Sequence, residues 1–133
     1  TRRSDATICL TSALAHHDLT DAIPGTLDVA IPRGGRSPAT EHAITWHQFD
    51  AATFDLGRDE ITIEGTDLSI GLYSPERCIA DAFRLRGQLG YETARDALKE
   101  WLRRGGKPNT LMRIALQLPR AKTPLLHALE TLS

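Results

Sequence analysis

The sequence offers few side chains that could carry out covalent chemistry. Ser12 and His16 lie one helical turn apart, so a serine nucleophile beside a histidine base is geometrically conceivable there. A serine nucleophile also needs an oxyanion site and an oriented base, and Ser12 lies in no sharp strand-to-helix turn of the kind that provides them. We therefore interpret Ser12 and His16 as polar groups on a helix surface.

The spacing of cysteine and histidine does not favour a metal centre. Cys9 and Cys78 are far apart in the chain, and neither has a second cysteine or histidine beside it at the spacing of zinc ligands. His42 and His47 differ by an odd number of positions, so on one strand they would point to opposite faces. We expect buried thiols and surface imidazoles, with no metal, no cofactor and no catalytic residue.

Four carboxylates gather around a predicted hairpin: Asp55, Asp59, Glu60 and Glu64. Such a cluster could hold the divalent ions of a metal-dependent nuclease or hydrolase. Those enzymes usually also position a lysine or an equivalent cation to stabilise the anionic transition state, and no lysine precedes Lys99. We favour charged strand edges that resist pairing with other chains, and keep a metal-dependent nuclease as the alternative, enzymatic hypothesis.

Charge is divided unevenly between the two halves of the chain. Residues 1–71 have a net charge of -6 and residues 72–133 a net charge of +5, although the whole chain carries only -1. A basic side of the molecule could contact a partner protein or nucleic acid, or could simply be a solvated surface. Two groups of cations are candidates for such a contact, one on a predicted helix and one in a glycine-rich loop. They are Arg95, Lys99, Arg103 and Arg104, and Arg33 and Arg36.

The spacing of apolar residues predicts strands in the first half of the chain. A helix capped by Ser4 or Asp5 should run as far as His17. Strand-like alternation follows at 27–31 and 42–49, then a short extended piece at 54–56 and a hairpin around the turn at 65–67. The first half should therefore form one helix and a small sheet.

At Ser74 the spacing of apolar residues changes from that of a strand to that of a helix. Ser74 is a suitable N-cap, Pro75 fits the first helical position, and Glu76 complements the helix dipole. Gly90 should end this helix, and three further helices should follow over 91–105, from an Asn109 cap, and from a Thr123 cap. The chain is thus predicted to be α+β: a small, mainly antiparallel or mixed sheet of four or five strands, one N-terminal helix and a C-terminal group of four helices.

The first C-terminal helix carries three charged residues at helical spacing. Arg77 and Asp81 lie one turn apart, and Arg84 follows Asp81 by less than one turn. We expect these side chains to form a charged lattice that fixes the junction between sheet and helices.

Length and composition fit one globular domain over residues 1–133. The chain has 133 residues, of which 41% are hydrophobic and 25% charged, enough for a core of its own. Two cysteines provide no disulfide framework, and the apolar runs are far shorter than the ~20 residues that span a bilayer. We expect a cytoplasmic protein without a membrane partner, and, because the chain begins at Thr1 rather than methionine, a fragment of a longer one.

Three segments of the chain follow one another in an order typical of a known family. They are the helix at 8–19, with Ser12-Ala13-Leu14 and His17, the strand and basic loop at 27–34, and the helix start with Ser74, Glu76, Arg77, Ile79 and Asp81. In this order they resemble the C-terminal domain of AbiEi-type antitoxins, from the AbiE abortive-infection toxin–antitoxin systems. The family's motifs read S-A-L-x-x-H-x-L and S-x-E-R-x-I/L-x-D, and the likeness covers residues 6–104.

The resemblance implies a bacterial, non-enzymatic antitoxin that counteracts an AbiEii-type nucleotidyltransferase toxin and represses its own operon. Operator DNA would be bound by an N-terminal winged helix-turn-helix, for which this chain shows no pattern. In such type IV systems toxin and antitoxin need not form a stable complex, so direct and indirect antagonism both stay open. A third hypothesis is that the domain is a dimerisation module for a DNA-binding regulator, which predicts a homo-oligomer.

Overall fold

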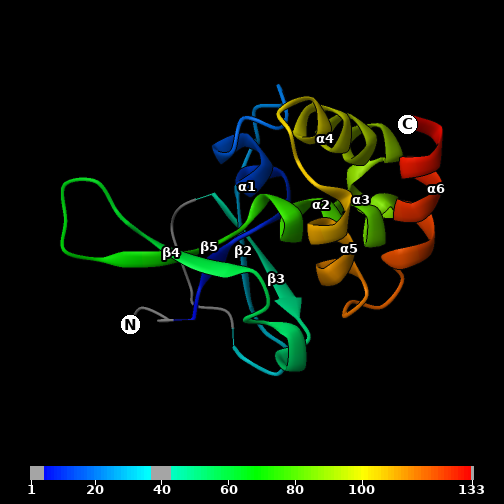
Figure 1. Ribbon diagram of the computed structural model, residues 1–133. Coiled ribbons are helices and arrows are strands. Elements are labelled where there is room, and N and C mark those ends of the chain that lie inside the picture. The colour runs from blue at the N-terminus through cyan, green and yellow to red at the C-terminus, as the bar shows by residue number, and fades with distance from the viewer. Residues whose placement is uncertain (1–4, 37–42, 133) are drawn as a thin grey trace.

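A computed structural model describes residues 5–36 and 43–132 of the chain (Figure 1). This part contains five strands, six α-helices and one short 3-10 helix, which confirms the predicted α+β class. The strands are β1 (Thr7–Ile8), β2 (Leu27–Pro32), β3 (Ile44–Phe49), β4 (Arg58–Thr62) and β5 (Ser69–Tyr73). The helices are α1 (Leu10–His16), η1 (Ala51–Thr53), α2 (Pro75–Arg84), α3 (Arg86–Leu89), α4 (Tyr91–Arg103), α5 (Pro108–Ala115) and α6 (Lys122–Leu132).

The strands form one mixed sheet in the order β3-β2-β1-β5-β4. β1 runs parallel to β5 and antiparallel to β2, so Thr7 pairs with Gly71 on one side and with Ala30 on the other. β2 and β3 are parallel, whereas β4 and β5 form the predicted antiparallel hairpin, which reaches away from the helices (Figure 1). The shortest strand therefore lies at the centre of the sheet.

Phe49 of β3 and Tyr73 of β5 pack against each other although two strands lie between theirs. Their ring centroids are 6.0 Å apart, and the register places both side chains on the same face of the sheet. The Tyr73 hydroxyl also donates to the Phe54 carbonyl at 2.6 Å. These aromatic rings therefore pack together at the junction between the sheet and α2.

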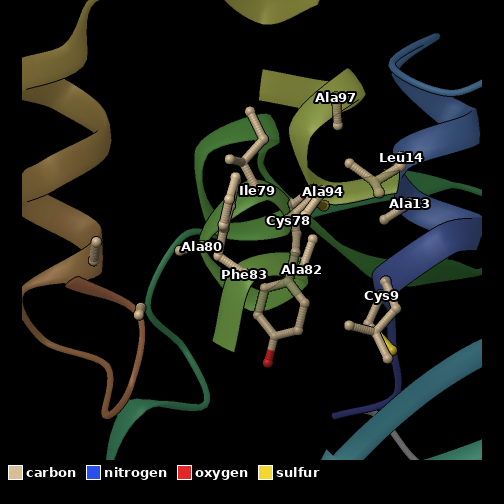
Figure 2. Packing of buried hydrophobic residues seen from close by; sticks show 14 of the residues in the cluster. Cys9, Ala13, Leu14, Cys78, Ile79, Ala80, Ala82, Phe83, Ala94 and Ala97 are labelled. Carbon is tan, nitrogen blue, oxygen red and sulfur yellow. Dashed lines mark hydrogen bonds between the residues drawn. The ribbon is translucent and has the colours of Figure 1, made fainter. Parts of the chain in front are cut away.

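Helix α2 is the centre of the helical half of the molecule. It contacts α1, α4, α5 and α6, and seven of its ten residues are buried. Figure 2 shows Cys78, Ile79 and Phe83 of α2 among small residues of the neighbouring helices, including Ala13 and Ala94. Small side chains at these contacts let the helices approach α2 closely from several sides.

The first helix begins later than the sequence pattern predicted. α1 starts at Leu10 with Cys9 as its N-cap, so Asp5 does not cap it, and Ser4 lies outside the described residues. Residues 7–8 form β1 instead, because strands on both sides provide partners for the backbone there. The strand predicted over 42–49 is seen at Ile44–Phe49, and His42 also lies outside the described part.

Three further expectations about local structure were wrong. Residues 54–56 are not extended, because the chain forms η1 and turns there, and the Asp50 side chain accepts from the Ala52 amide at 3.2 Å. The helix expected to run to Gly90 breaks at Leu85 into α2 and α3, so the described C-terminal group has five helices rather than four. Asn109 and Thr123 are not caps, because each lies inside the helix that it was expected to start.

Both cysteines are buried and free, as the sequence predicted. Burial raises the pKa of the Cys9 and Cys78 thiols well above the ordinary value, so neither is a reactive thiolate near neutral pH. Within residues 5–36 and 43–132, every helix is too short or too polar to cross a membrane.

Candidate functional site

The start of α2 joins the sheet to the helices through its first three residues. The Ser74 hydroxyl accepts from the Arg77 amide at 3.2 Å, and Pro75 occupies the first turn of the helix. Glu76 accepts from the indole nitrogen of Trp101 in α4, with Nε1 and Oε2 separated by 3.2 Å. The capping residues therefore also fix how α4 lies against α2.

Arg77 is completely buried and ties three parts of the chain together. Its Nε donates to Asp81 Oδ2 at 3.0 Å, and its Nη1 donates to the carbonyls of Thr53 and Leu56 at 2.7 and 2.8 Å. The guanidinium carbon also lies 4.3 Å from the centre of the Tyr73 ring, within the range of a cation–π contact. One side chain thus holds α2, β5 and the turn after β3 in a single arrangement.

Asp81 is equally buried and accepts from two arginines. Besides the bond from Arg77, its Oδ1 accepts from Arg84 Nε at 2.8 Å. The Arg84 guanidinium lies 4.9 Å from the centre of the Phe49 ring. We call Arg77, Asp81 and Arg84 the buried lattice, because the hydrogen bonds that join these three side chains lie within the fold.

Gly57 is a member of this junction that the sequence analysis did not identify. Its φ of +72° is in the left-handed region, and an added Cβ would lie 2.8 Å from Arg77 Cβ and 3.0 Å from Ser74 Oγ. Its carbonyl also accepts from the Ser74 amide at 2.8 Å. A glycine just before a strand is the only local signal, and many turns share that signal.

Replacing Gly57 with alanine should destabilise the protein by about 2–3 kcal/mol. The new Cβ would meet Arg77 in a backbone conformation that alanine rarely adopts. Urea denaturation followed by circular dichroism measures this loss. Gly65 is the matched control, because it also has a positive φ but an added Cβ there meets open space. If both alanine variants lose the same stability, the close packing on Arg77 has no effect of its own.

Two of the predicted basic residues form hydrogen bonds with neighbouring groups. They are Arg103, at the end of α4, and Arg104, its C-cap. Arg103 donates twice to Glu100, from Nε at 2.9 Å and from Nη2 at 2.5 Å, and Arg104 Nε donates to the same carboxylate at 2.7 Å. Arg104 also donates to the carbonyls of His17 and Asp18, at 3.0 and 2.6 Å. Arg104 therefore holds the end of α1 against α4.

Arg95 and Lys99 have fewer bonds to neighbouring groups than Arg103 and Arg104, so they are more available to a partner. Arg95 is 43% exposed and pairs weakly with its neighbour Asp96, and the exposed Lys99 has no ion-pair partner within the described ranges. A groove of about 700 Å³ lies between α4 and residues 18–22, and it contains cations and acids together. Its charged residues are Asp18, Asp21, Glu92, Asp96, Lys99, Glu100, Arg103 and Arg104. Interleaved carboxylates repel a phosphate backbone, so this surface suits a protein partner better than bare nucleic acid.

The second predicted basic group, Arg33 and Arg36, follows β2 in a turn. Both residues are exposed, the Arg33 amide donates to the Phe49 carbonyl at 2.7 Å, and the Gly35 amide donates to the Pro32 carbonyl at 3.0 Å. Figure 1 shows this turn and α4 at opposite ends of the view. The structure therefore does not bring the two predicted basic groups into one surface.

The other candidate groups do not converge on a reactive centre in the described part of the chain. Asp59 and Glu60 are consecutive on β4, so they point to opposite faces, and Glu60 pairs with Arg58 at 3.3 Å. Across residues 5–36 and 43–132, no three His, Cys, Asp or Glu side chains are grouped as metal ligands.

Ser12 bonds to Asp28 and not to His16, the partner that its spacing suggested. Its hydroxyl accepts from the Asp28 amide at 2.9 Å and lies 3.3 Å from the Asp28 carboxylate, which also bonds to His47 at 3.0 Å. In this order the carboxylate lies between the hydroxyl and the imidazole, so His47 is not placed to take the proton of Ser12. The sequence analysis missed Asp28, because its two partners come from α1 and β3.

Arg103 and Arg104 should make Glu100 unusually acidic. Their hydrogen bonds lower the pKa of Glu100 from 4.5 to about 2. Because the pKa is lowered in the folded state, the stabilising effect is present above pH 4.5 and is lost as the pH falls through about 2. A ¹³C NMR titration of the side-chain carboxyl should give this low midpoint, and it should rise in an R103A/R104A variant. A midpoint that stays low in that variant would contradict the assignment of these bonds.

No family model and no curated protein matches this chain.

Proposed function

We propose that this chain is the effector domain of an AbiEi-type antitoxin, which acts in the cytoplasm by binding rather than by catalysis. Its target would be an AbiEii-like nucleotidyltransferase toxin, and operator DNA would be bound by a separate N-terminal winged helix-turn-helix. The observation that carries this proposal is the resemblance of residues 8–19, 27–34 and 74–81 to the motifs of that family. The motif that resembles the family contains Arg77 and Asp81, both with 0% exposure and bonded within the fold.

This geometry assigns the family motif a role in folding. The charges of Arg77 and Asp81 serve the junction between sheet and helices, so a partner has to be recognised by other residues. Exposed cations of α4 provide a surface of mixed charge that fits a protein, and Arg95 and Lys99 have the fewest bonds to neighbouring groups among them. We assign the toxin-facing role to this surface, and a secondary contact to Arg33 and Arg36.

Growth rescue tests the proposed function most simply. The 133-residue chain is co-expressed with an AbiEii-type nucleotidyltransferase toxin, and colony formation is compared with that of cells expressing the toxin alone. Rescue is the expected result and places the antitoxin activity in this domain. Absence of rescue from a chain shown to be folded and abundant would overturn the proposal. A parallel assay for metal-dependent nuclease activity, with D59A as its control, tests the alternative enzymatic hypothesis.

A further inference from the structure

A second cavity, of about 900 Å³, opens between the end of α2, α3 and the start of α6. Arg84, Arg86, Arg120 and His127 line it together with Thr123. Among the described residues that line it, none is acidic, in contrast to the groove beside α4. The three arginines come from the end of α2, from α3 and from the turn before α6, so no pattern along the sequence could bring them together.

Arg84 is a recessed and fixed cation in this cavity. Its side chain is only 11% exposed, its Nε is bonded to Asp81, and its guanidinium lies over the Phe49 ring. Within the described part of the chain, its two terminal nitrogens have no hydrogen-bond partner. A guanidinium held in place with free donors can receive two oxygens of a phosphate group with little loss of conformational freedom.

Arg120 contributes a second, independent observation. It has a φ of +63°, a conformation that a non-glycine residue adopts only at a cost in energy. Its side chain is exposed and has no partner among the residues described. Within the described ranges, Arg120 therefore presents an unpaired guanidinium at this cavity.

The surroundings of these arginines also favour an anion. Arg86 Nη1 donates to the Phe83 carbonyl at 2.9 Å, which anchors that side chain beside the cavity. Thr123 lies in the first turn of α6, an 11-residue helix, so this wall of the cavity is at the positive end of the helix dipole.

We propose that this cavity binds the phosphate groups of a small polyphosphorylated molecule. A recessed arginine is reached by a phosphate chain that projects into the cavity, whereas the backbone of a duplex lies across a surface. The size of the cavity leaves room for more than one phosphate group. This binding site is independent of the toxin-facing role of α4.

Isothermal titration calorimetry on the whole chain tests this site, with tripolyphosphate and ATP as probes. We expect one molecule of either probe to bind per chain, with affinity that falls as salt is added. R86A and R120G should each weaken binding by about tenfold, the effect of losing one charge-assisted hydrogen bond. R120G should also melt at the same or a higher temperature, since glycine accepts the positive φ, so lost binding would not reflect unfolding.

R113A is the matched control, because Arg113 is an exposed arginine on α5 that does not line the cavity. It should bind both probes like the unchanged chain. Tighter binding of ATP than of tripolyphosphate would identify a nucleotide, and equal binding would identify the phosphate chain as the recognised group. No binding of either probe, equal weakening by R113A, or stronger binding of duplex DNA through the same arginines would overturn the proposal.

Discussion

Replacing Arg77 with alanine is expected to lower the free energy of unfolding by about 3–5 kcal/mol. The change leaves the buried carboxylate of Asp81 with one arginine instead of two and removes the donor to the carbonyls of Thr53 and Leu56. Domains of this kind are stable by only about 5–15 kcal/mol, so this loss is a large fraction of the total stability. Urea denaturation followed by circular dichroism measures the loss.

Two variants test whether the stability depends on the hydrogen bonds of the buried lattice or only on the charge of residue 77. R77K keeps the charge but lacks the planar fork of donors, so it should recover only a small part of the lost stability. R103A is the control for an exposed arginine, because Arg103 is 71% exposed and its removal should leave the unfolding free energy almost unchanged. If R77A and R103A were equally stable, the lattice would not hold the junction together.

Replacing Asp81 with alanine should have an effect of similar size, about 3–5 kcal/mol. It leaves the guanidinium groups of Arg77 and Arg84 without the carboxylate that joins them, and both lie over the Phe49 ring. The expected result is a sharp fall in the urea midpoint with little change in slope, since the native core is otherwise the same.

A double-mutant cycle tests whether Arg77 and Asp81 act as a pair. In R77M/D81L both charges are removed together, so no buried charge of this pair is left unpaired and the double variant should lose less than the sum of R77M and D81L. Additive losses would show that the two residues stabilise the fold independently.

Local chemistry explains which elements could be predicted from the sequence. The Ser74-Pro75-Glu76 start of α2 depends on a cap, a proline and a dipole-favoured acid within one turn, and the structure has all three in place. The β4–β5 hairpin is equally local. β1 could not be predicted, because two residues show no pattern and their extended form depends on strands that arrive later in the chain.

In the candidate site, too, only the contacts between residues close in sequence could be predicted. The one-turn spacing of Arg77 and Asp81 predicts their pairing, but the carbonyls of Thr53 and Leu56 come from more than 20 residues earlier, so burial of the pair was not predictable. The basic residues of α4 were visible as a pattern, whereas the bonds from Arg104 to the end of α1 depend on how the helices pack. The cavity lined by Arg84, Arg86 and Arg120 depends on the fold alone.

We propose that the motif at the start of α2 maintains the fold while the exposed cations of α4 meet the toxin. The most direct test is growth rescue by the chain carrying R95E and K99E, beside a control carrying R113E and K122E on α5 and α6. All four side chains are at least partly exposed, so both variants should melt close to the unchanged chain. We predict that the α4 variant loses rescue while the control keeps it. Full rescue by a folded α4 variant would contradict the account.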